Sequence, residues 1–323
     1  MAISLRAAAV AAVVFLPMLS LSPAHAQTRT WVSGVGNDID PCSRTAPCKT
    51  FAGAISKTAA GGEIKCIDSG GFGAVTITKS ITIDRLGAIG SILASGTNGV
   101  NVNDSATATP GTIKVILRNL TINGAGNTAL PGLVGINYVS GAQVHLDNVR
   151  IFGFRGGTAQ GVRMVSSGVG GNALFINDSV IEDNGSGIVI DPTGGSAQIA
   201  LTRVQIYKNS SDGFLASGAG AGQIFAGVFE SVSSLNGGHG FKAQGGGATV
   251  VVDVQRSAAN NNGAGGFTAD GLGAAVFIGN STATANGTGF NQLNSGQIRS
   301  YVNNAVDNNS NNGGATAPAL NPM

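Results

Sequence analysis

Gly187-Ile188-Val189-Ile190 is followed 26 residues later by Gly213-Phe214-Leu215-Ala216, and 27 residues after that by Gly240-Phe241-Lys242-Ala243. A glycine that opens a short apolar, alternating segment recurs at near-constant spacing through most of the chain. The glycines of this column are Gly135, Gly161, Gly187, Gly213, Gly240, Gly266 and Gly289. A fixed period of this length is typical of solenoids, in which each repeat contacts only its neighbours.

Each period also contains a second alternating run, such as Ile199–Leu201 or Val250–Val252, and a third, weaker run before an Asn-rich turn. No part of the repeat has the 3.6-residue period of a helix. A coil of three short strands cannot bury its own apolar side, so it must stack on its neighbours, about 4.8 Å apart, in parallel sheets. The sequence therefore predicts an all-β, right-handed parallel β-helix of about nine coils.

The repeat also predicts a register. Alternate residues of a strand point to opposite faces, so the residue after each glycine faces the core. These positions hold Ile136, Val162, Ile188, Phe214, Phe241, Phe267 and Phe290. We expect the four phenyl rings to stack from coil to coil. The turns repeat Asn184, Asn209, Asn236, Asn262, Asn286 and Asn309, and asparagine both tolerates the left-handed conformation of a tight corner and can hydrogen-bond between stacked coils.

The two ends depart from the repeat. Residues 50–59 favour a short helix that Thr50 caps and Gly61-Gly62 ends, and that covers the exposed core of the first coil. The Asn-, Gly- and Pro-containing residues 311–323 favour a flexible tail. We therefore expect an N-terminal cap over 27–72 and a β-helix over 73–310.

The first residues have the pattern of a signal peptide. Arg6 precedes the apolar run Ala7–Leu21, and Ala24-His25-Ala26 fits a small-x-small cleavage site. The run is too short to span a membrane, and no second one follows. We expect residues 1–26 to be removed and the protein to be secreted or periplasmic, without a transmembrane segment and as a monomer.

Charge and composition exclude one class of partner. Only 11% of the residues are charged, and the net charge is +2, or about +1 after loss of Arg6. Nucleic-acid binding needs a basic face to neutralise phosphates, and the chain has no Lys/Arg cluster. We expect no nucleic-acid partner.

The chain has three cysteines. Cys42 and Cys48 flank a short loop, and in an oxidising compartment we expect them to form a disulfide. Cys66 lies in an alternating run, where it is interpreted as a buried free thiol. No histidine lies near the cysteines, so a tetrahedral zinc site is incomplete.

The N-terminal stretch Trp31-Val32-Ser33, Pro41-Cys42, Cys48-Lys49-Thr50-Phe51 and Gly61-Gly62-Glu63-Ile64 resembles the opening of secreted bacterial proteins of the pectin-lyase-like β-helix superfamily. The Gly-apolar strands are similar to the superfamily's right-handed β-helix. The resemblance covers nearly the whole mature chain and implies a fold rather than an activity, because the superfamily includes lyases, glycosidases, esterases, adhesins and proteins without known activity. It implies that an active groove would lie on the outward face of the sheet that begins at the glycines.

Two pairs of opposite charge fall on that outward face. Arg163 lies beside Asp191, and Lys242 beside Asp270, each on a diagonal between neighbouring coils. In a lyase, Arg or Lys would act as the base or stabilise charge, and carboxylates would hold Ca²⁺. The alternative is that each pair is a cross-strand ion pair on a solvated face.

Other features depart from the enzymes of the superfamily. The two candidate aspartates lie three coils apart, and no Asp-Asp pair occurs to supply the two carboxyls of a glycosidase. His145 with Asp147 and Arg150 is a weaker cluster, interpreted as a polar surface strip, and His239 is interpreted as a solvated turn residue.

Two functions are compatible with this pattern. The first is a secreted or cell-surface β-helix that binds glycan or another extracellular partner without catalysis and needs no cofactor. The second is a pectate-lyase-like enzyme that acts on an acidic polysaccharide through Arg163 or Lys242 and uses Ca²⁺. We favour the first, because no catalytic set is complete.

Overall fold

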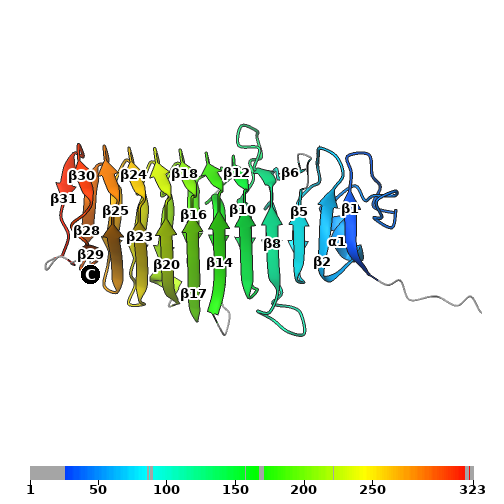
Figure 1. The fold of residues 1–323 in the computed structure, drawn as a ribbon, viewed down its shortest axis with the longest axis horizontal. Coiled ribbons are helices and arrows are strands. Elements are labelled where there is room, and N and C mark those ends of the chain that lie inside the picture. The colour runs from blue at the N-terminus through cyan, green and yellow to red at the C-terminus, as the bar shows by residue number, and fades with distance from the viewer. Residues whose placement is uncertain are drawn as a thin grey trace, which may run out of the picture.

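The computed structural model describes residues 26–85, 87, 90–156, 158–166, 171–220, 222–316 and 320. The chain forms a rod of stacked coils, with β1 and α1 at one end and β31 at the other (Figure 1). Each coil contributes strands to three parallel sheets of 11, 10 and 10 strands. The prediction of an all-β parallel β-helix of about nine coils is confirmed.

We name the sheets A, B and C. Sheet A contains β1 (Gln27–Val32), β2 (Thr58–Cys66), β5 (Ile81–Asp84), β8 (Lys114–Arg118), β11 (Gln143–Asp147), β14 (Gly171–Asn177), β17 (Ser196–Thr202), β20 (Gln223–Phe229), β23 (Val250–Gln255), β26 (Ala274–Gly279) and β29 (Gln297–Ser300). Sheet B contains β3 (Gly70–Gly71), β6 (Gly90–Leu93), β9 (Leu120–Asn123), β12 (Arg150–Phe152), β15 (Val180–Glu182), β18 (Gln205–Tyr207), β21 (Val232–Ser234), β24 (Ala258–Asn260), β27 (Thr282–Thr284) and β30 (Ala305–Asp307). Sheet C contains β4 (Val75–Ile77), β7 (Val100–Val102), β10 (Val134–Tyr138), β13 (Gln160–Met164), β16 (Ser186–Ile190), β19 (Phe214–Ser217), β22 (Phe241–Gln244), β25 (Gly265–Asp270), β28 (Thr288–Leu293) and β31 (Asn311–Gly313). The 3-10 helix η1 (Gly218–Gly220) lies in one of the connections from sheet C to sheet A.

The glycine column stands where the coils approach each other most closely. A Cβ on Gly187 would lie 2.3 Å from the carbonyl oxygen of Gly213 in the next coil, and one on Gly135 would lie 2.4 Å from that of Gly161. None of the seven glycines has a positive φ. Glycine is required here because of the close backbone approach rather than because of its backbone conformation.

The residues after these glycines form one wall of the core, as the register predicted. Phe214, Phe241 and Phe267 are fully buried, and Phe290 is 7% exposed. Their ring centroids lie 6.4, 5.7 and 6.0 Å apart along the four coils. These separations are within the range of favourable aromatic pairs, so the expected phenyl stack is confirmed.

A ladder of asparagine amides follows the turn between sheets B and C. The Nδ2 of Asn209 donates to Oδ1 of Asn236 at 2.9 Å, and the Nδ2 of Asn236 donates to Oδ1 of Asn262 at 3.0 Å. The ladder joins Asn184, Asn209, Asn236, Asn262, Asn286 and Asn309. The expected hydrogen bonding between coils is therefore confirmed.

The left-handed conformation expected of these asparagines belongs to their predecessors. Lys208 and Leu235, which precede Asn209 and Asn236, have φ values of 55° and 56°. The ladder asparagines themselves are not among the residues with positive φ. Asparagine occupies these positions for its amide, which both donates and accepts.

A short helix covers the N-terminal end of the rod, as expected. α1 (Phe51–Lys57) begins after Thr50, whose hydroxyl accepts a hydrogen bond from the Gly53 N–H at 2.9 Å. Phe51 is fully buried and packs on Phe72 of the first coil, with ring centroids 5.2 Å apart. The fold thereby covers core surface that would otherwise be exposed.

The bounds at this end differ from the expected ones. The helix ends at Lys57, and Gly61-Gly62 lies inside β2, which opens the first coil before residue 73. β1 also pairs in parallel with β2, so the cap contributes a strand to sheet A. The apolar alternation of β2 favours a strand over a longer helix because it places Ile64 in the core.

The cysteines have the expected states. Cys42 and Cys48 are joined by a disulfide that closes the loop ahead of α1. Cys66 is a free, buried thiol, and burial raises its pKa to about 12. A thiol with so high a pKa is a poor nucleophile at neutral pH, so its interpretation as a packing residue holds.

The C-terminal end is more ordered than expected. Asn311–Gly313 forms β31, which pairs with β28, rather than beginning a tail. Beyond it, the Thr316 N–H donates to the Ile298 carbonyl at 2.7 Å, and the Leu320 N–H donates to the Ser300 carbonyl at 2.9 Å. These bonds use the free edge of sheet A. Residues 317–319 and 321–323 lie outside the described residues, as does the expected signal peptide except for Ala26.

Among the residues that the structure describes, no helix is long and apolar enough to cross a membrane.

Candidate functional site

The outward face of sheet C carries the residues that the sequence singled out. Strand pairing places Asn137 beside Arg163, Leu215 beside Lys242, and Lys242 beside Thr268. A second row, displaced by two residues along the strands, aligns Ser217, Gln244, Asp270 and Leu293. The rows are those expected from the glycine column, because each strand begins at the same register.

Lys242 and Asp270 form a close ion pair. The Lys242 Nζ lies 3.0 Å from Oδ2 of Asp270, and the two side chains are 13% and 16% exposed. Asn294 donates a further hydrogen bond to Asp270 Oδ1 at 2.8 Å. Burial by itself would raise the pKa of Asp270, but the hydrogen bonds from Asn294 and Lys242 outweigh it and lower that pKa. The carboxylate therefore stays ionised and keeps the ammonium of Lys242 occupied.

His239 belongs to the same face and is not a solvated turn residue as expected. Its Nδ1 lies 2.8 Å from Oγ1 of Thr268, and its backbone N–H donates to Oδ1 of Asp212 at 2.8 Å. Thr268 is fully buried beneath it. The imidazole is half-buried, and it reaches the next coil while the backbone of its turn bonds the preceding one.

Burial and the charges nearby together set the pKa of His239. Burial lowers its pKa from the usual 6.5, and Lys242 lowers it further, while Asp212 and Asp270 act in the opposite direction. The net effect is a lowered pKa. The neutral imidazole is therefore the form that the folded protein favours.

We predict that His239 makes the fold less stable in mild acid. The unfolded chain takes up a proton near pH 6.5, whereas the folded protein takes it up at a lower pH. The free energy of unfolding is therefore unaffected by this group above pH 6.5 and falls as the pH drops from 6.5 towards the folded pKa. Thermal unfolding of wild type and His239→Gln between about pH 8 and pH 5 tests this. The wild type should lose more stability than the variant, and parallel curves would contradict the prediction.

Arg163 is placed differently from Lys242. It lines a hollow of about 360 Å³ with Asn98, Leu133, Val134, Asn137, Gly156 and Thr158. No carboxylate within the described ranges pairs with its guanidinium. Its charge is therefore available to a ligand, whereas that of Lys242 is already matched.

Asparagine amides form one side of this hollow. Asn98 and Asn137 both donate through Nδ2 to Oδ1 of Asn101, at 2.8 and 3.0 Å. The Oδ1 of Asn137 is buried and has no hydrogen-bond partner among the described residues. A buried acceptor without a donor carries a desolvation cost for the fold.

Asp191 does not join Arg163. The described residues include no ion pair between them, and the Asp191 Oδ1 is buried without a hydrogen-bond partner. Arg163 instead lines the hollow with Asn98 and Asn137, which belong to earlier coils. The expected pairing of Arg163 with Asp191 is not formed, and the hollow lies on the side of Arg163 away from Asp191.

The carboxylates do not fit a calcium ion. Calcium takes six to eight oxygen ligands, several of them carboxylates. The described residues contain no group of three or more His, Cys, Asp or Glu side chains that could hold a metal. Asp270 already binds Lys242 and Asn294. We therefore derive no chemistry from a metal at this face.

The weaker cluster around His145 lies on sheets A and B. His145 stacks on Phe175, with ring centroids 4.5 Å apart, and Asp147 lies 3.2 Å from Arg118. Arg150 points elsewhere and pairs with Glu182 at 2.6 Å. Each side chain has its own neighbour, which agrees with the interpretation of a polar surface strip.

Sequence reasoning missed the amides that accompany Arg163 and the bond from His239 to Thr268. A signal for the amides was present, because Gly99-Val100-Asn101-Val102 is an irregular member of the glycine column. Its outward residue is Asn101, which the strand pairing places beside Asn137. No comparable signal existed for His239, whose partner is 29 residues away.

Comparison with known proteins identifies the fold and no more. No family model matches the chain, and no curated protein matches it in sequence. A crystal structure of pectate lyase Pel9A is similar with a TM-score of 0.51 at 16% identity, covering 90% of this chain and 81% of the other. A rhamnogalacturonan lyase has a TM-score of 0.39 at 14% identity, with coverage of 83% and 74%. A GH136 lacto-N-biosidase from Eubacterium ramulus has 0.37 at 10% identity, with coverage of 86% and 67%.

Proposed function

We propose that this protein is an exported β-helix that binds an acidic polysaccharide through Arg163, without cleaving it and without a cofactor. The observation that carries the proposal is a guanidinium with no carboxylate partner among the described residues, in a hollow lined by amides. A guanidinium recognises a carboxylate through two parallel hydrogen bonds, which makes a uronate a suitable ligand.

The surroundings of Arg163 suit a sugar acid. Asn98 and Asn137 line the hollow, and Thr158 at its exposed rim offers a hydroxyl to a sugar. The hollow lies on the outward face of a long parallel sheet, where a polymer can lie across several coils. Export is supported by the Cys42–Cys48 disulfide, since such bonds persist in oxidising compartments.

Cleavage is the competing proposal. A lyase would use Arg163 or Lys242 to take a proton or stabilise charge on the same face. The Lys242 ammonium already lies 3.0 Å from Asp270, so it is not free to contact a substrate. Arg163 forms no ion pair with a carboxylate of the described residues that could complete an acid-base pair, so binding without cleavage is preferred.

Replacing Arg163 by alanine is expected to weaken binding of polygalacturonate by about tenfold to a hundredfold, because a hydrogen-bonded charge contributes roughly 1.5–3 kcal/mol. Isothermal titration calorimetry of the mature protein measures this, and affinity should also fall as salt is raised. Arg299→Ala is the matched control, because Arg299 lies on sheet A and bonds Gln297. Equal affinity of wild type and Arg163→Ala would contradict the proposal.

The same samples test the competing proposal. Wild type incubated with polygalacturonate and Ca²⁺ should produce no unsaturated product by ultraviolet absorbance. Turnover that disappears in Arg163→Ala or Lys242→Ala would replace binding by lyase activity as the function.

A further inference from the structure

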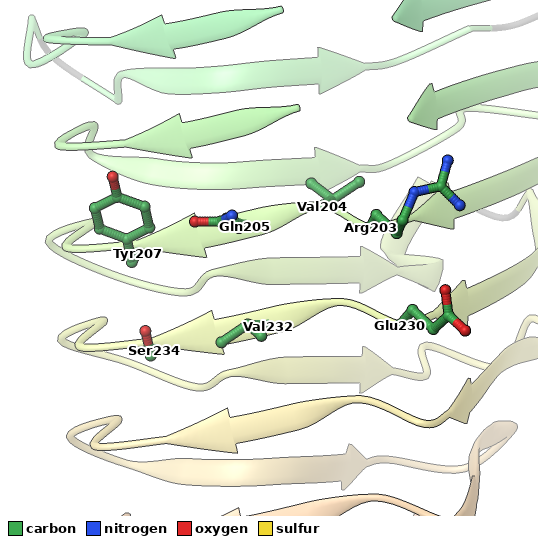
Figure 2. Close-up of a pocket in the computed structure, with 7 residues that line it drawn as sticks. All are labelled: Arg203, Val204, Gln205, Tyr207, Glu230, Val232 and Ser234. Carbon is green, nitrogen blue, oxygen red and sulfur yellow. The ribbon is translucent and has the colours of Figure 1, made fainter. Parts of the chain in front are cut away.

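A second hollow lies on a different sheet from the Arg163 hollow. It has a volume of about 210 Å³ and opens on the outward side of β18 and β21 in sheet B. Its lining is aromatic at one end, charged at the other and polar between them (Figure 2). The residues are Arg203, Val204, Gln205, Tyr207, Glu230, Val232 and Ser234.

Tyr207 forms the aromatic end of the hollow and has a neighbour on each of the two adjacent coils. Strand pairing places Glu182 of the preceding coil beside it, and Glu182 is itself paired with Arg150 at 2.6 Å. On the following coil, strand pairing places Ser234 beside Tyr207. The serine side chain is short and covers little of the phenol ring, and the Lys208 Nζ lies 6.0 Å from the ring centroid. Figure 2 shows the ring at the end of the hollow, with its hydroxyl directed away from Ser234.

The charged end of the hollow carries one positive and one negative side chain, so its net charge is zero. Arg203 and Glu230 occupy the same left-handed corner in successive coils, with φ values of 53° and 50°. Arg203 makes two hydrogen bonds to Asp178, at 2.6 and 2.8 Å, and Glu230 lies 3.2 Å from Arg256. Each charge in the hollow is therefore already paired with an opposite one, and the hollow has little attraction for an ion.

The polar groups between the two ends are free to bind. Gln205 and Ser234 make no side-chain hydrogen bond to the rest of the described chain. Gln205 offers both donors and an acceptor, and Ser234 offers a hydroxyl. Figure 2 shows the Gln205 amide between Tyr207 and Arg203 on one strand. A ligand that stacks on the ring can reach both groups.

We infer that this hollow binds an uncharged pyranose. The apolar C–H face of the sugar stacks on Tyr207, and the sugar hydroxyls hydrogen-bond to Gln205 and Ser234. Because the charges of Arg203 and Glu230 are already paired, the hollow does not favour a carboxylate over a hydroxyl. A peptide is disfavoured, because β18 is already paired with both β15 and β21 and offers no free edge. This site lies on sheet B and is separate from the Arg163 site, so either can exist without the other.

The test uses neutral oligosaccharides built from glucose, galactose or xylose. Ligand-observed NMR on the mature protein should detect binding of at least one of them. Tyr207→Ala should weaken that binding by about tenfold or more, because the stacking surface is lost. Tyr207→Phe should retain it within about threefold, because the ring remains. Thr284→Ala is the matched control, since Thr284 occupies the same register on sheet B three coils further on.

Two results would overturn the inference. One is that no neutral oligosaccharide binds the wild type, and the other is that Tyr207→Ala binds as tightly as the wild type. Arg163→Ala distinguishes this site from the proposed function, because it should lose polygalacturonate and keep the neutral ligand. If Tyr207→Ala loses the far-ultraviolet circular dichroism of the folded protein, Ser234→Phe is used as the test variant instead. This substitution fills the hollow and should also abolish binding.

Discussion

Phe241→Ala is expected to lower the free energy of unfolding by about 3–5 kcal/mol, the range of Phe→Ala substitutions in well-packed cores. Phe241 is fully buried and lies between Phe214 and Phe267, with ring centroids 6.4 and 5.7 Å away. The loss combines the buried apolar surface of one ring with two aromatic contacts. The cavity cannot collapse easily, because the backbone of each coil is hydrogen-bonded to both neighbours.

Urea denaturation followed by far-ultraviolet circular dichroism measures this effect. Phe225→Ala is the matched control, since Phe225 lies on the outward face of sheet A and is 44% exposed. We expect it to cost less than about 1 kcal/mol. A Phe241→Ala variant that unfolds at the same urea concentration as Phe225→Ala would show that the phenyl stack does not stabilise the rod.

Asn236→Ala is expected to cost about 2–6 kcal/mol. The Asn236 Oδ1 accepts from both the backbone N–H and the Nδ2 of Asn209, at 3.1 and 2.9 Å. Both donors are buried, and each would be left without this acceptor at about 1–3 kcal/mol. The Asn236 Nδ2 also donates to Asn262, so two neighbouring coils lose a contact.

The urea midpoint of Asn236→Ala should therefore fall far below that of an exposed amide variant. Asn303→Ala supplies the comparison, because the Asn303–Asn280 bond of 3.1 Å is on the surface. We expect that control to change stability by no more than about 0.5 kcal/mol. Similar midpoints for the two variants would mean that water replaces the ladder amide, contrary to the burial of Asn236.

The scaffold could be predicted because its signals are local and repeated. The residue after each glycine points inward for the same reason in every coil, so Phe241 and Phe267 were placed correctly from spacing alone. The asparagine ladder follows from the same period. The bounds of α1 were less predictable, because residues 58–66 can extend either the helix or the sheet, and pairing with β1 decides between them.

The candidate sites were less predictable, because they depend on which of several neighbouring residues a long side chain contacts. The diagonal from Lys242 to Asp270 formed an ion pair, whereas the equivalent diagonal from Arg163 to Asp191 did not. The sequence places both pairs at the same positions of the repeat. Arg163 instead lines a hollow with Asn98 and Asn137, which come from the coils that precede it.

The sequence by itself determined the coil, the inward and outward faces and the amide ladder, since these follow from a period that every coil repeats. The tertiary structure alone decided what each outward residue meets. His239 bonds Thr268 of the next coil, and Tyr207 has the short side chain of Ser234 beside it in the next coil. Such contacts join residues more than 25 positions apart whose side chains carry no periodic signal, so only the stacked coils bring them together.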